Sequence, residues 1–157
     1  MKIKKIYKRD LNSLYELGKE EFKQEFWFTK DFLEESLNRK GIFLGAFEKT
    51  KLIGAILIDI SIDRPKAWIF FFIVKKGYRG QGIGHKLLEN VEKKLPKEYY
   101  KLFVDFEKTD RLAIRFYKNH GFKKAGKVKD WFGNGTCGLI YSKTIKKQKT
   151  PKSYLFT

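Results

Sequence analysis

Three glycines at alternate positions, Gly80, Gly82 and Gly84, lie between an apolar segment and an amphipathic one. Because glycine adopts backbone conformations closed to other residues, the N–H groups of such a turn can point into one concavity. Where the turn opens a helix, the positive end of the helix dipole strengthens the attraction for an anion. The segment 77–86 is therefore predicted to bind phosphate groups, above all a diphosphate.

The elements on either side of this turn fit that prediction. Residues 68–74 are almost wholly apolar and rich in aromatic and β-branched side chains, which predicts a strand buried on both faces. Apolar residues then recur at helical spacing from Ile83 to Leu95, and Pro96 ends the pattern. The glycines therefore join a strand to a helix.

Two better-known glycine motifs do not fit this turn. The dinucleotide fingerprint needs a glycine three residues after its middle glycine, and that position is His85. A P-loop needs Lys followed by Ser or Thr after its last glycine, whereas Lys86 is followed by Leu87. Neither class of nucleotide site is indicated.

Arg79, Gly82 and Gly84 instead match Gln/Arg-x-x-Gly-x-Gly/Ala, and the segment thereby resembles the acetyl-CoA-binding motif of the GCN5-related N-acetyltransferases. In that family the motif follows the fourth strand and opens the third helix, as it does in the elements predicted here. A second family motif, Asn-x-x-Ala-x-x-(aromatic or Leu)-Tyr, follows at 110–117, with Asp110 in place of Asn. Two motifs in the family's order argue against a chance match.

The resemblance implies an enzyme that transfers an acetyl group from acetyl-CoA to a primary amine by direct attack in a ternary complex. The diphosphate would lie on main-chain N–H groups of the glycine turn, and the pantetheine would pair with the backbone of 72–74, where an N–H would polarise the thioester carbonyl. The implied donor-binding residues are Phe72, Ile73, Val74, Arg79, Gly80, Gln81, Gly82, Ile83, Gly84, His85, Asp110 and Tyr117.

Tyr117 occupies the position from which the family's tyrosine donates a proton or a hydrogen bond to the departing CoA sulfur. A phenol, with a pKa of about 10, is protonated at neutral pH and suits this role. Leu112, Ala113 and Phe116 share a helical pattern with Tyr117, so packing in the core is the alternative role for its ring.

A general base is needed because an amine acceptor is mostly protonated near pH 7. The strand 68–74 has no carboxylate, although many relatives carry a glutamate there. Asp105 matches the position of the glutamate in the branch that acetylates ribosomal proteins and is predicted to be the base, with Glu107 on the same strand face as the reserve. Both carboxylates are equally consistent with residues at the end of a strand that only face solvent. Asp110 is equally consistent with a helix N-cap.

Hydrophobic periodicity and turn residues divide the chain into eleven elements. The predicted strands cover 2–7, 42–48, 51–60, 68–74, 100–106, 122–129 and 136–144, and the predicted helices cover 11–22, 30–40, 83–95 and 110–120. This is the order of the family's fold, an α+β three-layer architecture with a mixed central sheet of about seven strands flanked by about four helices. We expect a single such domain over 1–146 and a basic tail over 147–157.

The charge balance constrains the partners. Lys and Arg number 35 against 18 Asp and Glu, so the net charge is +17. This field attracts anions and repels polyamines and aminoglycosides at long range. We therefore expect an amine acceptor that is anionic overall or is presented on an anionic carrier such as RNA or the ribosome. The alternative function is a basic module that binds nucleic acid or the ribosome on the same scaffold without acetyl transfer.

Some kinds of site are not indicated. No window of about 18 apolar residues and no charged-then-apolar leader occurs, so we expect no membrane association and a cytoplasmic protein. Cys137 is the single cysteine, and His85 and His120 lie far apart in sequence, so neither a metal site nor an internal disulfide is expected. The acceptor's identity stays open, as does the choice between a monomer and a homodimer.

Overall fold

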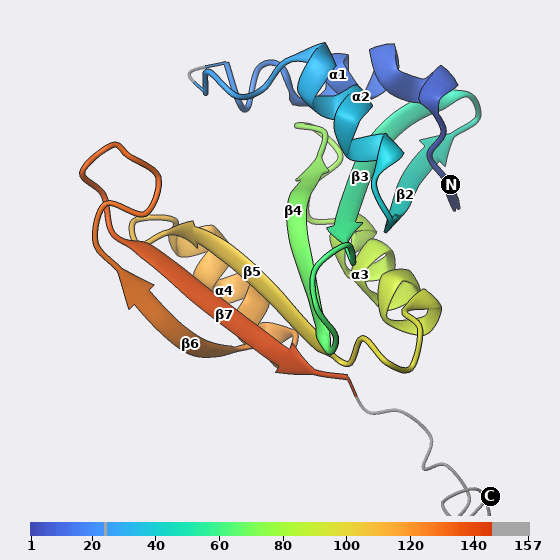
Figure 1. The fold of residues 1–157 in the computed structure, drawn as a ribbon. Helices are drawn as coiled ribbons and strands as arrows, with labels where there is room; N and C mark the ends of the chain where they lie inside the picture. The colour runs from blue at the N-terminus through green and yellow to red at the C-terminus, as the bar shows by residue number, and fades with distance from the viewer. Residues whose placement is uncertain (24, 146–157) are drawn as a thin grey trace, which may run out of the picture.

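The computed structural model describes residues 1–23 and 25–145, which form one mixed sheet between two layers of helices (Figure 1). The strands are β1 (Lys2–Lys5), β2 (Gly41–Glu48), β3 (Lys51–Asp59), β4 (Lys66–Val74), β5 (Lys101–Glu107), β6 (Lys123–Val128) and β7 (Gly138–Thr144). Their spatial order is β1-β2-β3-β4-β5-β7-β6. Neighbouring strands are antiparallel except β4 and β5, which run parallel. The predicted seven-stranded mixed sheet is confirmed.

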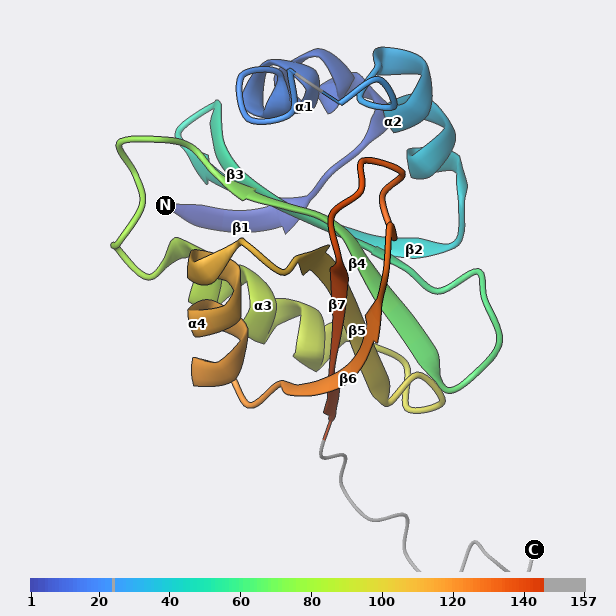
Figure 2. The same ribbon diagram turned by 90° about the vertical axis from the view of Figure 1, so that its left-hand side faces the viewer.

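Helices cover both faces of this sheet. In the described part of the chain they are α1 (Leu11–Gly18), α2 (Lys30–Asn38), α3 (Ile83–Lys94) and α4 (Arg111–Asn119), with a short 3₁₀ helix at Lys8–Asp10. Figure 2 shows α1 and α2 on one side of the sheet and α3 and α4 on the other. The three-layer arrangement expected from the order of elements is therefore present.

Each face of the sheet buries its own apolar core, because successive side chains of a strand point to opposite faces. On the α3 side, Leu87 of α3 and Leu102 of β5 are fully buried. On the α1 and α2 side, Leu14, Leu33 and Leu57 are fully buried. The central strands therefore hold the two helical layers together.

Burial of β4 follows its prediction in part. Alternate residues from Ala67 to Ile73 are buried, whereas Phe72 and Val74 are only half-buried. The strand nevertheless contributes buried residues to both cores, as predicted: Ala67 and Ile69 on the α3 side, and Phe71 and Ile73 on the α1 and α2 side. β5 pairs with β4 only along Lys66–Ile69. Beyond that point the two strands diverge, and Phe72 and Val74 pack against the core on one side and border an open cavity on the other.

The other boundaries differ little from the prediction, with one instructive exception. Helix α1 ends at Gly18, so Phe22 lies in the turn that follows and not on the helix. A Cβ on Gly18 would lie 2.5 Å from the Phe28 ring, so the close approach of that ring requires glycine, which is a weak helix former.

The predicted tail, 147–157, lies outside the described residues. No helix among the described residues is long and apolar enough to cross a bilayer.

The packing of α3 on the sheet leads to a first prediction. Leu87→Ala should lower the free energy of unfolding by about 3 kcal/mol, because a fully buried side chain is replaced by a cavity. Ile62→Ala, at a residue that is 37% exposed, should cost about 0.5 kcal/mol or less. Urea unfolding followed by circular dichroism measures both, and equal losses would contradict this assignment of the core.

Candidate functional site

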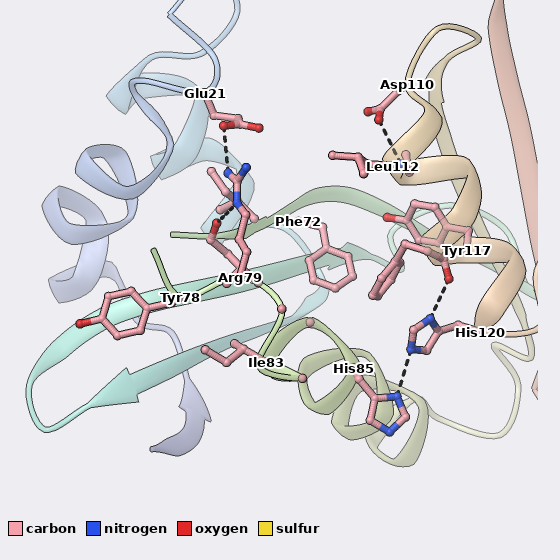
Figure 3. A pocket seen from close by; sticks show the side chains of 17 residues that line it. Glu21, Phe72, Tyr78, Arg79, Ile83, His85, Asp110, Leu112, Tyr117 and His120 are labelled. Atoms are coloured by element: carbon pink, nitrogen blue, oxygen red, sulfur yellow. Dashed lines mark hydrogen bonds and ion pairs between the residues drawn. The ribbon is translucent and has the colours of Figure 1, made fainter. Parts of the chain in front are cut away.

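A cavity of about 540 Å³ opens where β4 and β5 diverge. Its walls come from the end of β4, the glycine turn, the start of α3 and one face of α4 (Figure 3). Every donor-binding residue predicted from the two motifs lines it except Gln81. The fold thus brings together two segments that lie about thirty residues apart in sequence.

The glycine turn has the backbone geometry that its composition predicts. Gly80 and Gly82 have φ values of 78° and 80°, in the left-handed region that residues with a Cβ adopt at a cost. Gly82 is the N-cap of α3, and its carbonyl accepts the first helical bond from the Lys86 N–H at 3.0 Å. The N–H groups of residues 83–85 precede this first bond and have no helical partner, so they can bind an anion.

Arg79 reaches across the cavity wall and makes two contacts. Its Nε–H donates to the Val74 carbonyl at 2.8 Å, and its Nη2 lies 3.0 Å from Glu21 Oε2. Glu21 lies in the turn between α1 and α2 and itself lines the cavity. Sequence reasoning missed Glu21, because no motif or periodicity distinguishes it from the other acidic residues of that turn.

Tyr117 forms part of the opposite wall. Its ring is 6% exposed and stacks on Phe106, with ring centroids 5.6 Å apart. Burial raises the pKa of the Tyr117 phenol well above its ordinary value, and the negative charges of Asp110 and Asp105 raise it further. The phenol therefore keeps its proton throughout the physiological range. The ring thus packs in the core, and the residue also lines the cavity.

Asp110 caps α4, as its place in the sequence suggested. Its Oδ1 accepts a hydrogen bond from the Ala113 N–H at 3.0 Å. A carboxylate at a helix N-terminus is stabilised by the helix dipole. Asp110 also lines the cavity, so capping and a contact with a ligand do not exclude each other.

The two predicted base candidates lie on β5, outside the set of residues that line the cavity. Each carboxylate is held by the loop between β6 and β7. Asp105 Oδ2 accepts from Trp131 Nε1–H at 2.7 Å, and Glu107 Oε1 accepts from Asn134 Nδ2 at 2.7 Å. These bonds fix the loop against β5, where Trp131 and Phe132 stay 42% and 40% exposed.

A histidine pair, which sequence reasoning also missed, joins the two helices that border the cavity. His120 Nδ1 lies 2.7 Å from the Phe116 carbonyl, which can only accept, so Nδ1 carries the hydrogen. In the neutral ring His120 Nε2 then accepts from His85 Nδ1–H at 3.0 Å. The first turn of α3 is thereby tied to the last turn of α4.

Among the described residues, no group of three or more His, Cys, Asp or Glu is placed to hold a metal ion.

Comparison with known proteins agrees with this geometry. The acetyltransferase (GNAT) family model matches residues 3–122. The sequence is similar to N-alpha-acetyltransferase 30 of Schizosaccharomyces pombe, with 25% identity over 100 residues, or 61% of this chain and 67% of that protein.

Solved structures resemble more than nine tenths of the chain. The ribosomal-protein-S18-alanine N-acetyltransferase of Escherichia coli has a TM-score of 0.80 at 18% identity and covers 96% of this chain and 97% of its own. An aminoglycoside 6'-N-acetyltransferase complexed with coenzyme A has a TM-score of 0.82 at 18% identity, covering 96% and 100%. The PaiA N-acetyltransferase of Thermoplasma acidophilum, in complex with coenzyme A, has 0.75 at 24% identity, covering 91% and 98%. At these identities the likeness shows a shared fold.

Proposed function

This chain belongs to the acetyltransferase (GNAT) family, and on that premise we propose that it transfers the acetyl group of acetyl-CoA to a primary amine by direct attack in a ternary complex. We assign this activity to a cytoplasmic enzyme with one catalytic domain over residues 1–146. The observation that carries the proposal is the cavity itself, which has the N-terminus of α3 on one wall and a protonated phenol on the other.

The donor fits this cavity in a defined direction. Its diphosphate would lie on the N–H groups at the start of α3, where the helix dipole and the free donors both favour an anion. The pantetheine arm would run along the edge of β4 that β5 leaves unpaired, from Phe72 to Val74, and its amides would bond to that backbone. The thioester would then lie between β4 and Tyr117.

Direct attack is supported by the chemistry of the lining residues. Among the described residues that line the cavity there is no Cys, Ser, Thr or Lys side chain to form an acyl-enzyme. The amine nitrogen would attack the carbonyl carbon, the C–N bond would form, and the C–S bond would break. Tyr117 would donate a hydrogen bond to the departing sulfur, and its raised pKa makes it a permanent hydrogen-bond donor more than a full proton donor.

The amine must lose a proton before or during attack, and we assign that proton to Asp105, through a water molecule. Asp105 lies on β5, the strand next to β4, and its negative charge contributes to the raised pKa of Tyr117. The Trp131 Nε1–H bond holds its carboxylate in place. Glu107, bound by Asn134, is the alternative base.

For the acceptor we favour the α-amine of a protein or peptide. The similar protein of S. pombe is an N-alpha-acetyltransferase, and the bacterial structure of the same fold is a ribosomal-protein-alanine N-acetyltransferase. The net charge of +17 also suits an amine presented on an anionic carrier such as the ribosome. Another structural neighbour is an aminoglycoside N-acetyltransferase, but an aminoglycoside carries several positive charges and would meet long-range repulsion from this chain.

Donor binding tests the proposal first. Acetyl-CoA at about 100 times its Kd should stabilise the protein by about 2.7 kcal/mol and raise Tm by roughly 5–10 °C. Gly82→Glu should abolish this shift, because it places a negative charge at the glycine turn, where the diphosphate would bind.

A panel of amines, including peptides with free N-termini, should then identify an acceptor through thiol release. Salt-sensitive RNA binding with no shift from acetyl-CoA would instead favour a nucleic-acid module.

Tyr117→Phe should lower kcat by roughly 100-fold while leaving the Kd of acetyl-CoA within about twofold, since the ring still packs but no longer donates to the sulfur. Steady-state kinetics and isothermal titration calorimetry measure the two effects. Because burial raises the pKa of this phenol, its ionisation should cause no loss of wild-type rate below about pH 10. An unchanged kcat in the variant would remove Tyr117 from the chemistry.

Asp105→Asn should lower kcat/KM for the amine by roughly 100-fold and make the remaining rate depend on the free amine that already exists in solution. The pH dependence of kcat/KM measures this effect. Trp131→Phe is the matched control, since it keeps the carboxylate and removes only one hydrogen bond, and it should cost about tenfold or less. A pH–rate profile identical to that of the wild type would exclude Asp105 and leave Glu107 to be tested.

A further inference from the structure

The proposed acetyl transfer poses an electrostatic difficulty that the cavity itself addresses. The acceptor amine approaches as an ammonium ion, whereas the protein carries a net charge of +17. A group in the cavity must therefore attract a cation. In the described part of the chain, the carboxylates that line the cavity belong to Glu21 and Asp110. Figure 3 shows them on opposite sides of the cavity.

These two carboxylates are not equally suited to a cation. Asp110 caps α4, and its Oδ1 is already bonded to the Ala113 N–H. The positive end of the α4 dipole at that position opposes a second positive charge. Glu21 lies in the irregular turn after α1, and its side chain is 49% exposed and already bound to a cation, the guanidinium of Arg79. A site that holds one nitrogen cation has the charge and the acceptor geometry to hold another.

We propose that Glu21 binds the ammonium group of the acceptor, and that donor binding frees it for this role by drawing Arg79 away. This inference rests on the proposed function and adds an acceptor-binding residue to it. Removal of the ammonium proton stays with Asp105.

The contacts of Arg79 give the exchange its physical basis. Arg79 donates to the Val74 carbonyl and to Glu21, so it occupies both a backbone acceptor at the end of β4 and the carboxylate proposed for the amine. A diphosphate on the adjacent glycine turn offers the guanidinium a charge-assisted, two-pronged partner. The ion pair with Glu21 is weak enough to exchange, because both side chains are about half exposed, at 46% and 49%. Pantetheine amides compete for the same Val74 carbonyl.

The exchange predicts opposite effects on the two substrates. In Glu21→Gln, acetyl-CoA should bind as tightly as in the wild type or up to about fivefold more tightly, because its diphosphate no longer competes with a carboxylate for the Arg79 guanidinium. The KM for the amine that the wild type acetylates fastest should rise about tenfold, with kcat changed by less than about twofold. The hydroxyl isostere of that amine should inhibit both proteins equally, because it carries no charge for Glu21 to bind.

Calorimetry with acetyl-CoA and steady-state kinetics with the amine make these measurements. Glu20→Gln is the matched control, since it removes a neighbouring exposed charge that does not line the cavity, and neither substrate should be affected. Glu21→Asp keeps the charge and should recover most of the amine affinity. A Glu21→Gln variant with weakened acetyl-CoA binding and a wild-type KM for the amine would overturn the proposal and leave Glu21 as a brace for Arg79. Failure of the acetyltransferase assignment would show differently, as a wild-type protein that releases no thiol with any amine.

Discussion

The parting of two parallel strands is the constraint on which the rest of the site depends. β4 and β5 pair along only four residues of each strand and then diverge, and aromatic side chains of α4 lie between them. Phe116 and Tyr117 contact Phe72 of β4 with ring centroids 5.5 and 6.5 Å away, and Tyr117 stacks on Phe106 of β5. These rings fill part of the space between the two strands. One edge of β4 is left with backbone groups that must find other partners.

Those unpaired backbone groups explain why Arg79 lies where it does. A carbonyl at a strand end that no neighbouring strand satisfies is costly unless another donor reaches it, and the Arg79 Nε–H does so at Val74. The same guanidinium then contacts Glu21, which links the turn after α1 to the glycine turn. The two turns at the cavity are therefore connected through one ion pair between half-exposed side chains.

The two sides of the cavity differ in what sequence could predict about them. The glycine turn is local: glycines with positive φ, an apolar strand before them and an amphipathic helix after them follow from spacing alone, and the structure has each. β4 contributes buried residues to both cores, as predicted, but its composition could not show where β5 diverges from it and leaves Phe72 and Val74 at the cavity. The contacts of Asp105 with Trp131 and of His85 with His120 span 26 and 35 residues, distances over which no periodicity carries information.

By itself, the sequence determined the family, the order of elements and the position of the glycine turn at the start of α3, because these depend on short-range patterns of residue type. Only the tertiary structure decided which charges meet in the cavity. Glu21 and Arg79 are 58 residues apart and become partners through the stacking of α1 on one face of the sheet and the exit of β4 at its end. Long-range pairing of side chains depends on how layers pack, and packing is a property of the whole chain.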